Sequence, residues 1–273
     1  MTIGDISLVL VGAGKMGGAM LSGWLDMGLN PANVTVIDPG LPQEMNQLAE
    51  QKGFRFIATP YGIVCPDVVV VAVKPQVMDK VLPTLKSLVG ASTVVISVAA
   101  GTPVSAFKAH LGEEALVVRA MPNTPAQVGR GMTAAFASHG VTASMRTLTA
   151  ALLSSMGMFV WVESEGQIDA VTAISGSGPA YVFHMVEAMA SAGEALGLDA
   201  ETAGILARQT IVGAGELLHQ SALPAATLRK NVTSPGGTTA AALNVLMAEQ
   251  GGLGALMEKA TTAARDRSIE LSK

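Results

Sequence analysis

A glycine-rich turn near the N-terminus constrains the fold of this chain more than any other sequence feature. The apolar run Ser7–Val11 leads directly into it, and a segment with helical spacing, Gly17–Met27, follows it. Asp38 lies 21 positions after Gly17, at the end of the next β-branched run. A strand, a G-x-G-x-x-G turn, a helix and a later acidic residue are together typical of a dinucleotide-binding unit. The turn consists of Gly12, Ala13, Gly14, Lys15, Met16 and Gly17.

Each glycine of this turn has its own physical role. Gly12 permits the tight turn, Gly14 lets the backbone approach a pyrophosphate, and Gly17 lets the helix pack against the strand. The free N–H groups and the positive end of the helix then face the phosphates. We therefore predict that all six residues of the turn, together with Asp38, bind a dinucleotide cofactor.

Asp38 bears on which dinucleotide is bound. Its carboxylate would accept hydrogen bonds from the adenosine ribose hydroxyls, which favours NADH. The negative charge would repel the 2′-phosphate of NADPH, and Asp38-Pro39-Gly40 offers no Arg or Ser to receive that phosphate. The prediction is therefore NADPH or NADH, with NADH favoured.

The first half of the chain alternates strand-like and helix-like segments, which indicates an α/β fold with a doubly wound parallel sheet. The second half is rich in Ala, Gly and Met, and its periodicity is helical. We place the boundary between an N-terminal domain, 1–163, and an all-α domain, 164–273. The predicted strands are 7–11, 34–37, 54–57, 68–73, 93–98, 116–120 and 159–162, and the predicted helices are 17–27, 43–52, 77–89, 180–196, 200–220, 240–250 and 252–271.

Composition excludes several classes of function. Charged residues make up 14% of the chain, against roughly 25% in a typical soluble protein, so we expect the chain to cover apolar surface by self-association. A net charge of −4 provides no basic field for nucleic acid or an anionic membrane. The one cysteine, Cys65, excludes an intramolecular disulfide, and we expect it to be buried. We predict no metal site, no membrane span and a cytoplasmic location.

Five further segments resemble one family, the pyrroline-5-carboxylate reductases. The resemblance implies an N-terminal Rossmann domain and a C-terminal helical domain that dimerises, with dimers that in this family often assemble into decamers. It also implies reduction of the C=N bond of 1-pyrroline-5-carboxylate to give proline, with NADPH or NADH. The segments are Ala72–Pro75, Ser97–Gly101, Arg119–Pro125, Ser175–Tyr181 and Ser234–Thr239.

The resemblance assigns the nicotinamide riboside to two turns at the carboxyl ends of predicted strands. One contains Val73, Lys74 and Pro75, in which Pro75 biases Lys74 toward an extended backbone. The other is Ala99–Gly101, whose small residues leave room for a flat ring. A polar residue ahead of the 68–73 strand commonly holds the ribose in this family, and Thr59 is the nearest candidate. The further cofactor residues are Val73, Lys74, Pro75, Ala99, Ala100, Gly101 and Asn123.

The most specific segment, Ser234–Thr239, precedes a predicted helix. Two glycines and a hydroxyl residue at a helix start expose backbone N–H groups, which makes an anion site that suits the substrate carboxylate. We predict that the Thr239 hydroxyl polarises the ring nitrogen, with Thr238 as second candidate. The predicted substrate residues are Met121, Val232, Ser234, Gly236, Gly237, Thr238 and Thr239.

Two other functions fit the same fingerprint. A β-hydroxyacid dehydrogenase would need an acid–base lysine on a helix of the second domain, and no lysine occurs between Lys108 and Lys230. A non-catalytic NAD(P)-binding sensor would need no separate carboxylate site, which the 234–239 segment provides. Both remain alternatives to the reductase at this point.

Overall fold

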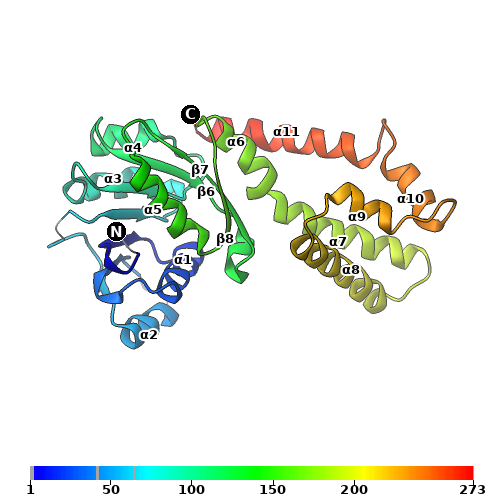
Figure 1. The fold of residues 1–273 in the computed structure, drawn as a ribbon, viewed down its shortest axis with the longest axis horizontal. Coiled ribbons are helices and arrows are strands. Elements are labelled where there is room, and N and C mark those ends of the chain that lie inside the picture. The colour runs from blue at the N-terminus through cyan, green and yellow to red at the C-terminus, as the bar shows by residue number, and fades with distance from the viewer. Residues whose placement is uncertain (1–2, 41–42, 64, 273) are drawn as a thin grey trace. The chain divides into compact units, whose positions relative to one another are not determined.

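The computed structural model describes residues 3–40, 43–63 and 65–272. The chain divides into two compact units, which are Met1–Gly176 with Ala264–Lys273, and Ser177–Ala263. Unit 1 contains a sheet of eight strands among the described residues, in the order β3-β2-β1-β4-β5-β6-β7-β8. Figure 1 labels β6, β7 and β8 of this sheet. The strands are β1 Leu8–Val11, β2 Val34–Ile37, β3 Arg55–Ile57, β4 Val68–Val71, β5 Val94–Ser97, β6 Leu116–Met121, β7 Gly131–Ala137 and β8 Gly157–Trp161.

Adjacent strands of the sheet are parallel except for β6 and β7, which pair antiparallel. The α/β prediction with a doubly wound parallel sheet is confirmed. The helices are α1 Lys15–Asp26, α2 Gln43–Lys52, α3 Met78–Leu85, α4 Val104–Leu111, α5 Ala143–Ser154, α6 Gln167–Val171, α7 Gly178–Ala195, α8 Ala200–Gln220, α9 Ala225–Asn231, α10 Thr238–Leu246 and α11 Leu253–Leu271.

The central strands are buried on both faces because helices cover both sides of the sheet. All four residues of β1, β4 and β5 are buried, which explains why these segments are continuous apolar runs. Trp24 of α1 and Leu152 of α5 belong to the core on one face, where the Trp24 indole donates to the Leu152 carbonyl at 2.9 Å. Leu82 of α3 and Phe107 of α4 belong to the core on the other face. Burying one such side chain contributes about 1.5–3 kcal/mol.

Several elements differ from the sequence prediction. Strand β7 and helices α4, α5, α6 and α9 were not predicted. The last strand is Gly157–Trp161 rather than 159–162. Cys65 is exposed, so the expectation that it is buried was wrong. It precedes β4 by three positions and therefore lies outside the strand whose residues are buried.

Unit 2 leaves much of its apolar surface exposed. Its described hydrophobic side chains are buried only at Ala203 and Ala207. Phe183 is 63% exposed, Leu196 87% and Val245 72%. Helices α7 and α8 do pack together, since a Cβ on Gly193 would lie 3.1 Å from that of Ala203. A surface this apolar requires cover from another molecule.

The observed units and the predicted domains differ in extent. Unit 1 continues to Gly176 and includes Ala264–Lys273, whereas the predicted N-terminal domain ends at residue 163. The segment from 164 to 176 contains α6 and the π-helical turn Thr172–Gly176. The functional boundary at 163/164 therefore stays a prediction.

Candidate active site

The three glycines of the fingerprint turn occupy three different environments. Gly12 has a φ of +92°, and a Cβ on it would lie 2.8 Å from the Ala72 carbonyl oxygen. A Cβ on Gly17 would collide with the carbonyl oxygen of Gly12. Around Gly14, by contrast, no described atom lies within 4 Å of the Cβ position. The first and third glycines are required by the protein itself, and the second faces open space where a phosphate can approach.

The helix that follows this turn begins without a side-chain cap among the described residues. Gly14 is the N-cap of α1, so the N–H groups of the first turn remain available to an anion. Asp38, at the end of β2, is held beside them because its Oδ2 accepts from the Ala13 N–H at 2.8 Å. Its Oδ1 accepts from the Gly40 N–H at 2.9 Å. The structure thus brings Asp38 to the turn.

A cavity of about 480 Å³ connects several of the predicted cofactor residues. Lys74 has the extended backbone expected before Pro75, with φ −67° and ψ 144°. Lys80 and Thr84 of α3 also line this cavity; they were not predicted, because no local sequence pattern connects them to Asp38. The predicted residues that line it are Gly12, Gly14, Asp38, Thr59, Val73 and Lys74.

The second predicted nicotinamide turn follows β5. Gly101 has a φ of +71°, and a Cβ on it would lie 3.3 Å from the Leu271 carbonyl oxygen. The C-terminal end of α11 therefore lies against this turn. Ala99 is buried and Ala100 is exposed, so the turn presents a small side chain to the surface.

Met121 and Asn123 connect two of the family-like segments. The Asn123 amide donates from Nδ2 to the Ser175 carbonyl at 3.0 Å and accepts from the Met132 N–H through Oδ1 at 2.8 Å. A Cβ on Gly176 would lie 2.6 Å from the Met121 Cε. These contacts leave Asn123 one N–H and one oxygen lone pair for a ligand. Its role as a cofactor residue stays a prediction.

The glycine–threonine loop, Ser234–Thr239, belongs to unit 2. Gly236 has a φ of +71°, and Gly237 is the N-cap of α10, with no capping side chain among the described residues. The first N–H groups of α10 are consequently free. Thr238 is exposed, Thr239 half-buried and Val232 67% exposed. This is the local geometry that an anion site requires.

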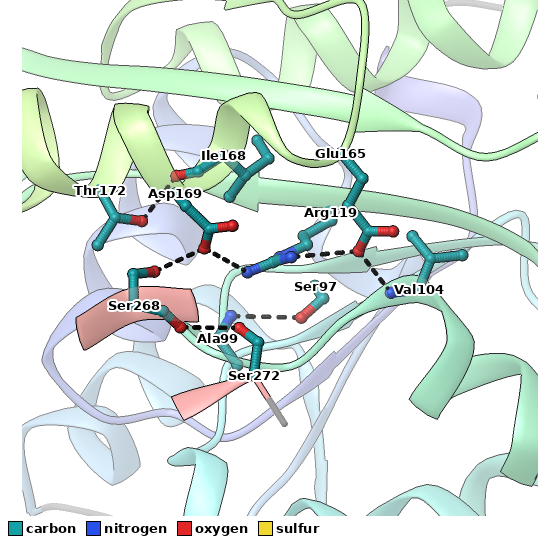
Figure 2. Close-up of polar contacts among 10 residues, drawn as sticks. All are labelled: Ser97, Ala99, Val104, Arg119, Glu165, Ile168, Asp169, Thr172, Ser268 and Ser272. Atoms are coloured by element: carbon teal, nitrogen blue, oxygen red, sulfur yellow. Dashed lines mark hydrogen bonds and ion pairs between the residues drawn. The ribbon is translucent and has the colours of Figure 1, made fainter. Parts of the chain in front are cut away.

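A buried charged cluster in unit 1 was not anticipated from the sequence. Figure 2 shows Arg119 of β6 between two carboxylates. Its Nη1 donates to Glu165 Oε1 at 3.2 Å, and its Nη2 lies 3.9 Å from Asp169 Oδ1. Ser268 of α11 donates to the same Asp169 oxygen at 2.7 Å. We call these four residues the Arg119 cluster.

Within the described part of the chain, no group of three His, Cys, Asp or Glu side chains is arranged to hold a metal ion. No described helix is both long enough and apolar enough to span a bilayer.

Comparison with known proteins now identifies the family. Residues 165–271 match the family model described as pyrroline-5-carboxylate reductase dimerisation, and residues 7–101 match the model described as NADP oxidoreductase, coenzyme F420-dependent. The first match covers the helical region with the exposed apolar surface, so this region is a self-association domain. The second match covers the fingerprint turn, Asp38 and both predicted nicotinamide turns.

Whole-chain relatives agree with these models. Pyrroline-5-carboxylate reductase of Pasteurella multocida is 36% identical over 98% of both chains. The structure of a pyrroline-5-carboxylate reductase from Coxiella burnetii has a TM-score of 0.90 and 38% identity, covering 98% of this chain and 99% of that one. The Plasmodium falciparum enzyme, solved with NADP bound, has a TM-score of 0.81 and 28% identity over both full chains. Because the enzyme of Pseudomonas aeruginosa is also 40% identical over 97% of both chains, this chain belongs to the pyrroline-5-carboxylate reductase family.

Proposed function

We propose that this protein reduces 1-pyrroline-5-carboxylate to L-proline with NADPH or NADH, the last step of proline biosynthesis. The observation that carries the proposal is the likeness to pyrroline-5-carboxylate reductases over almost the whole chain. Both alternatives lose support from it, because neither a hydroxyacid dehydrogenase nor a cofactor sensor would be expected to share the whole chain with this family.

The residues present fit a nicotinamide dinucleotide. Gly14 faces open space and the first N–H groups of α1 are uncapped, so this turn would bind the pyrophosphate. When bound, the cofactor supplies the hydride that reduces the imine carbon. Asp38 would hold the adenosine ribose, and Val73–Pro75 and Ala99–Gly101 would hold the nicotinamide end.

Choice of cofactor depends on two opposing charges in one cavity. Asp38 favours NADH, whereas Lys74 and Lys80 line the same cavity and could pair with a 2′-phosphate. The NADP-bound Plasmodium falciparum relative and the matched NADP oxidoreductase model favour NADPH. We therefore propose that both cofactors are used.

The glycine–threonine loop would bind the substrate carboxylate. The uncapped start of α10 attracts an anion, and a helix N-terminus stabilises such a charge by about 0.3–1 kcal/mol when exposed and up to about 2 kcal/mol when partly buried. The backbone N–H groups of Thr238 and Thr239 would donate to it, since the Gly237 N–H already donates to the Ser234 carbonyl at 3.0 Å. Ser234, Val232 and Met121 would complete the substrate contacts.

The chain needs little acid–base chemistry if the imine arrives protonated, because an iminium already accepts hydride well. Thr239 would donate a hydrogen bond near the ring nitrogen and orient the ring. Holding two reactants in register can lower a barrier by about 7–11 kcal/mol. The main contribution of this protein to the rate is therefore the orientation of the cofactor by the fingerprint turn and of the substrate by the glycine–threonine loop.

We also propose a homodimer, either alone or as the unit of a larger ring such as a decamer. The exposed apolar side chains of α7, α8 and α10 would be covered by a second copy of unit 2. Analytical ultracentrifugation should show a dimer or a multiple of dimers. A stable folded monomer would contradict the assembly proposal.

The proposed reaction is tested by following NADPH and NADH oxidation with 1-pyrroline-5-carboxylate, and proline formation, at matched enzyme concentrations. We expect stoichiometric proline. Turnover of a 3-hydroxy acid without turnover of the imine would support the dehydrogenase instead. Cofactor binding without turnover of either substrate would support the sensor.

A further inference from the structure

The Arg119 cluster holds both ends of the Ala99–Gly101 turn. Arg119 pairs in register with Ser97, the last residue of β5, two positions before the turn. On the far side, Glu165 Oε1 accepts from the Val104 N–H at 2.7 Å, at the start of α4. The N-cap of α4 is Pro103, and it provides no side-chain cap. Glu165 therefore replaces a local cap and connects the start of α4 to Arg119 (Figure 2).

The C-terminal helix closes the third side of the same turn. Leu271 lies against Gly101, with 3.3 Å between its carbonyl oxygen and the position of a Gly101 Cβ. One turn earlier, Ser268 is 5% exposed and donates to Asp169 at 2.7 Å. The last turn of α11 is thus fixed by Asp169, which faces Arg119 at 3.9 Å.

Stability alone does not account for a guanidinium at this position. Arg119 is 3% exposed, and its Nε and Nη2 have no hydrogen-bond partner among the described residues. An unsatisfied buried donor is costly, and a buried ion pair is often no more stable than apolar residues of similar volume. A cluster with this cost is better explained by what it positions.

We propose that the Arg119 cluster is a positioning device for the nicotinamide end of the cofactor, and that Ser268 at the C-terminal end of the chain is one of its positioning residues. The inference rests on the proposed function, in which the Ala99–Gly101 turn contacts the nicotinamide. Loss of the Ser268–Asp169 hydrogen bond frees the end of α11 from Asp169 and loosens the turn that it covers. The adenosine end, bound at Gly12–Gly17 and Asp38, is not altered.

The chain provides a matched control for this hydrogen bond. Ser272 lies one turn after Ser268, and its hydroxyl donates to the Ser268 carbonyl at 3.0 Å, within the C-terminal segment itself. Ser268→Ala and Ser272→Ala therefore remove the same atoms from neighbouring turns, but only Ser268→Ala breaks the connection to Asp169.

The test measures the dissociation constants of two ligands for the full-length wild type and both variants. One ligand is NADPH or NADH, whichever the wild type binds more tightly, and the other is its nicotinamide-free counterpart, 2′-phospho-ADP-ribose or ADP-ribose. We expect Ser268→Ala to weaken dinucleotide binding about 3- to 10-fold, the effect of one hydrogen bond. Its binding of the nicotinamide-free ligand, and both affinities of Ser272→Ala, should stay at the wild-type value.

Equal weakening of both ligands in Ser268→Ala, or no weakening, would overturn the proposal. Glu165→Gln is a second variant, because glutamine can still accept from the Val104 N–H but cannot neutralise Arg119. It should also weaken dinucleotide binding selectively, and an unchanged ratio of the two affinities would count against the cluster. Failure of the proposed function is separate, since it appears as a wild type that binds the dinucleotide but does not reduce 1-pyrroline-5-carboxylate.

Discussion

The carboxylate of Asp38 accepts a hydrogen bond from the backbone N–H of Ala13 at 2.8 Å, across 25 residues of sequence. This bond ties the acidic residue at the end of β2 to the fingerprint turn. It places a negative charge at the ribose end of the proposed cofactor site, in a cavity that Lys74 and Lys80 also line.

Asp38→Ser should therefore shift cofactor preference toward NADPH. Removing the carboxylate removes both the acceptor for the ribose hydroxyls and the repulsion of a 2′-phosphate. We expect the ratio of kcat/KM for NADPH to that for NADH to rise about tenfold, equivalent to about 1.4 kcal/mol. Steady-state kinetics with both cofactors measures this ratio, and a ratio that falls or stays constant would show that Asp38 does not face the ribose.

Two glycines of the turn provide a matched pair of variants. Gly14→Ala meets no described atom within 4 Å, so its free energy of unfolding should fall by about 1 kcal/mol or less, the range of an exchanged N-cap. Gly17→Ala collides with the Gly12 carbonyl and should lose about 1–3 kcal/mol. Chemical denaturation measures both values.

For cofactor binding, Gly14→Ala is the variant in which we expect the affinity to fall. The Cβ of Gly14→Ala would occupy the space proposed for the pyrophosphate, so this well-folded variant should bind the dinucleotide at least about tenfold more weakly, a loss of about 1.4 kcal/mol. Titration calorimetry of the variant tests this. Wild-type affinity in a folded Gly14→Ala protein would place the phosphates elsewhere.

Thr239→Ala should impair turnover without abolishing it. A threonine hydroxyl is too weak an acid to be an essential proton donor, and one neutral hydrogen bond contributes about 0.5–1.5 kcal/mol. We expect kcat to fall about tenfold or less and Thr239→Ser to restore most of it. Complete loss of activity in Thr239→Ala, with folding and cofactor affinity intact, would disprove this role.

The N-cap of α8 gives the helical unit a pH dependence. The Thr202 N–H donates to Asp199 Oδ1 at 2.9 Å, and this hydrogen bonding lowers the pKa of Asp199 below its ordinary value. A carboxyl group whose pKa is lower in the folded state contributes stability above its unfolded pKa, and that contribution is lost as the pH falls through the folded value.

Asp199→Asn isolates this contribution, because asparagine can cap the helix without titrating. The Tm of the wild type should exceed that of Asp199→Asn at pH 7, and the difference should shrink as the pH falls below the ordinary aspartate pKa of about 3.9 and disappear once the pH is below the lowered pKa of the folded state. Thermal unfolding across this pH range measures it. A difference that grows on acidification would have the wrong sign.

The parts of the fold that could be predicted are those with a strong local signal. The apolar runs of β1, β4 and β5 are buried on both faces, and α8 follows an N-cap aspartate. Strand β7, Gly131–Ala137, was missed because its sequence, GMTAAFA, contains mostly Gly and Ala, which have low strand propensity. Its place in the sheet depends on pairing with β6 and β8, which no local pattern reveals.

The site divides in the same way. The fingerprint turn and the glycine–threonine loop are each contiguous in sequence, so their spacing indicates their chemistry. The Arg119 cluster unites positions 119, 165, 169 and 268, and only tertiary structure brings them together. Lys80 likewise lines the cavity beside Asp38, but it lies on α3, far from Asp38 in the sequence. The residues next to Asp38 therefore give no sign of it.

The most direct test of the account is a crystal structure of the assembled protein with proline and an oxidised dinucleotide. We predict that the proline carboxylate accepts hydrogen bonds from the backbone N–H groups of Thr238 and Thr239, at the start of α10. Its ring should then lie against the nicotinamide beside the Ala99–Gly101 turn. Proline bound with its carboxylate away from α10 would contradict the central claim.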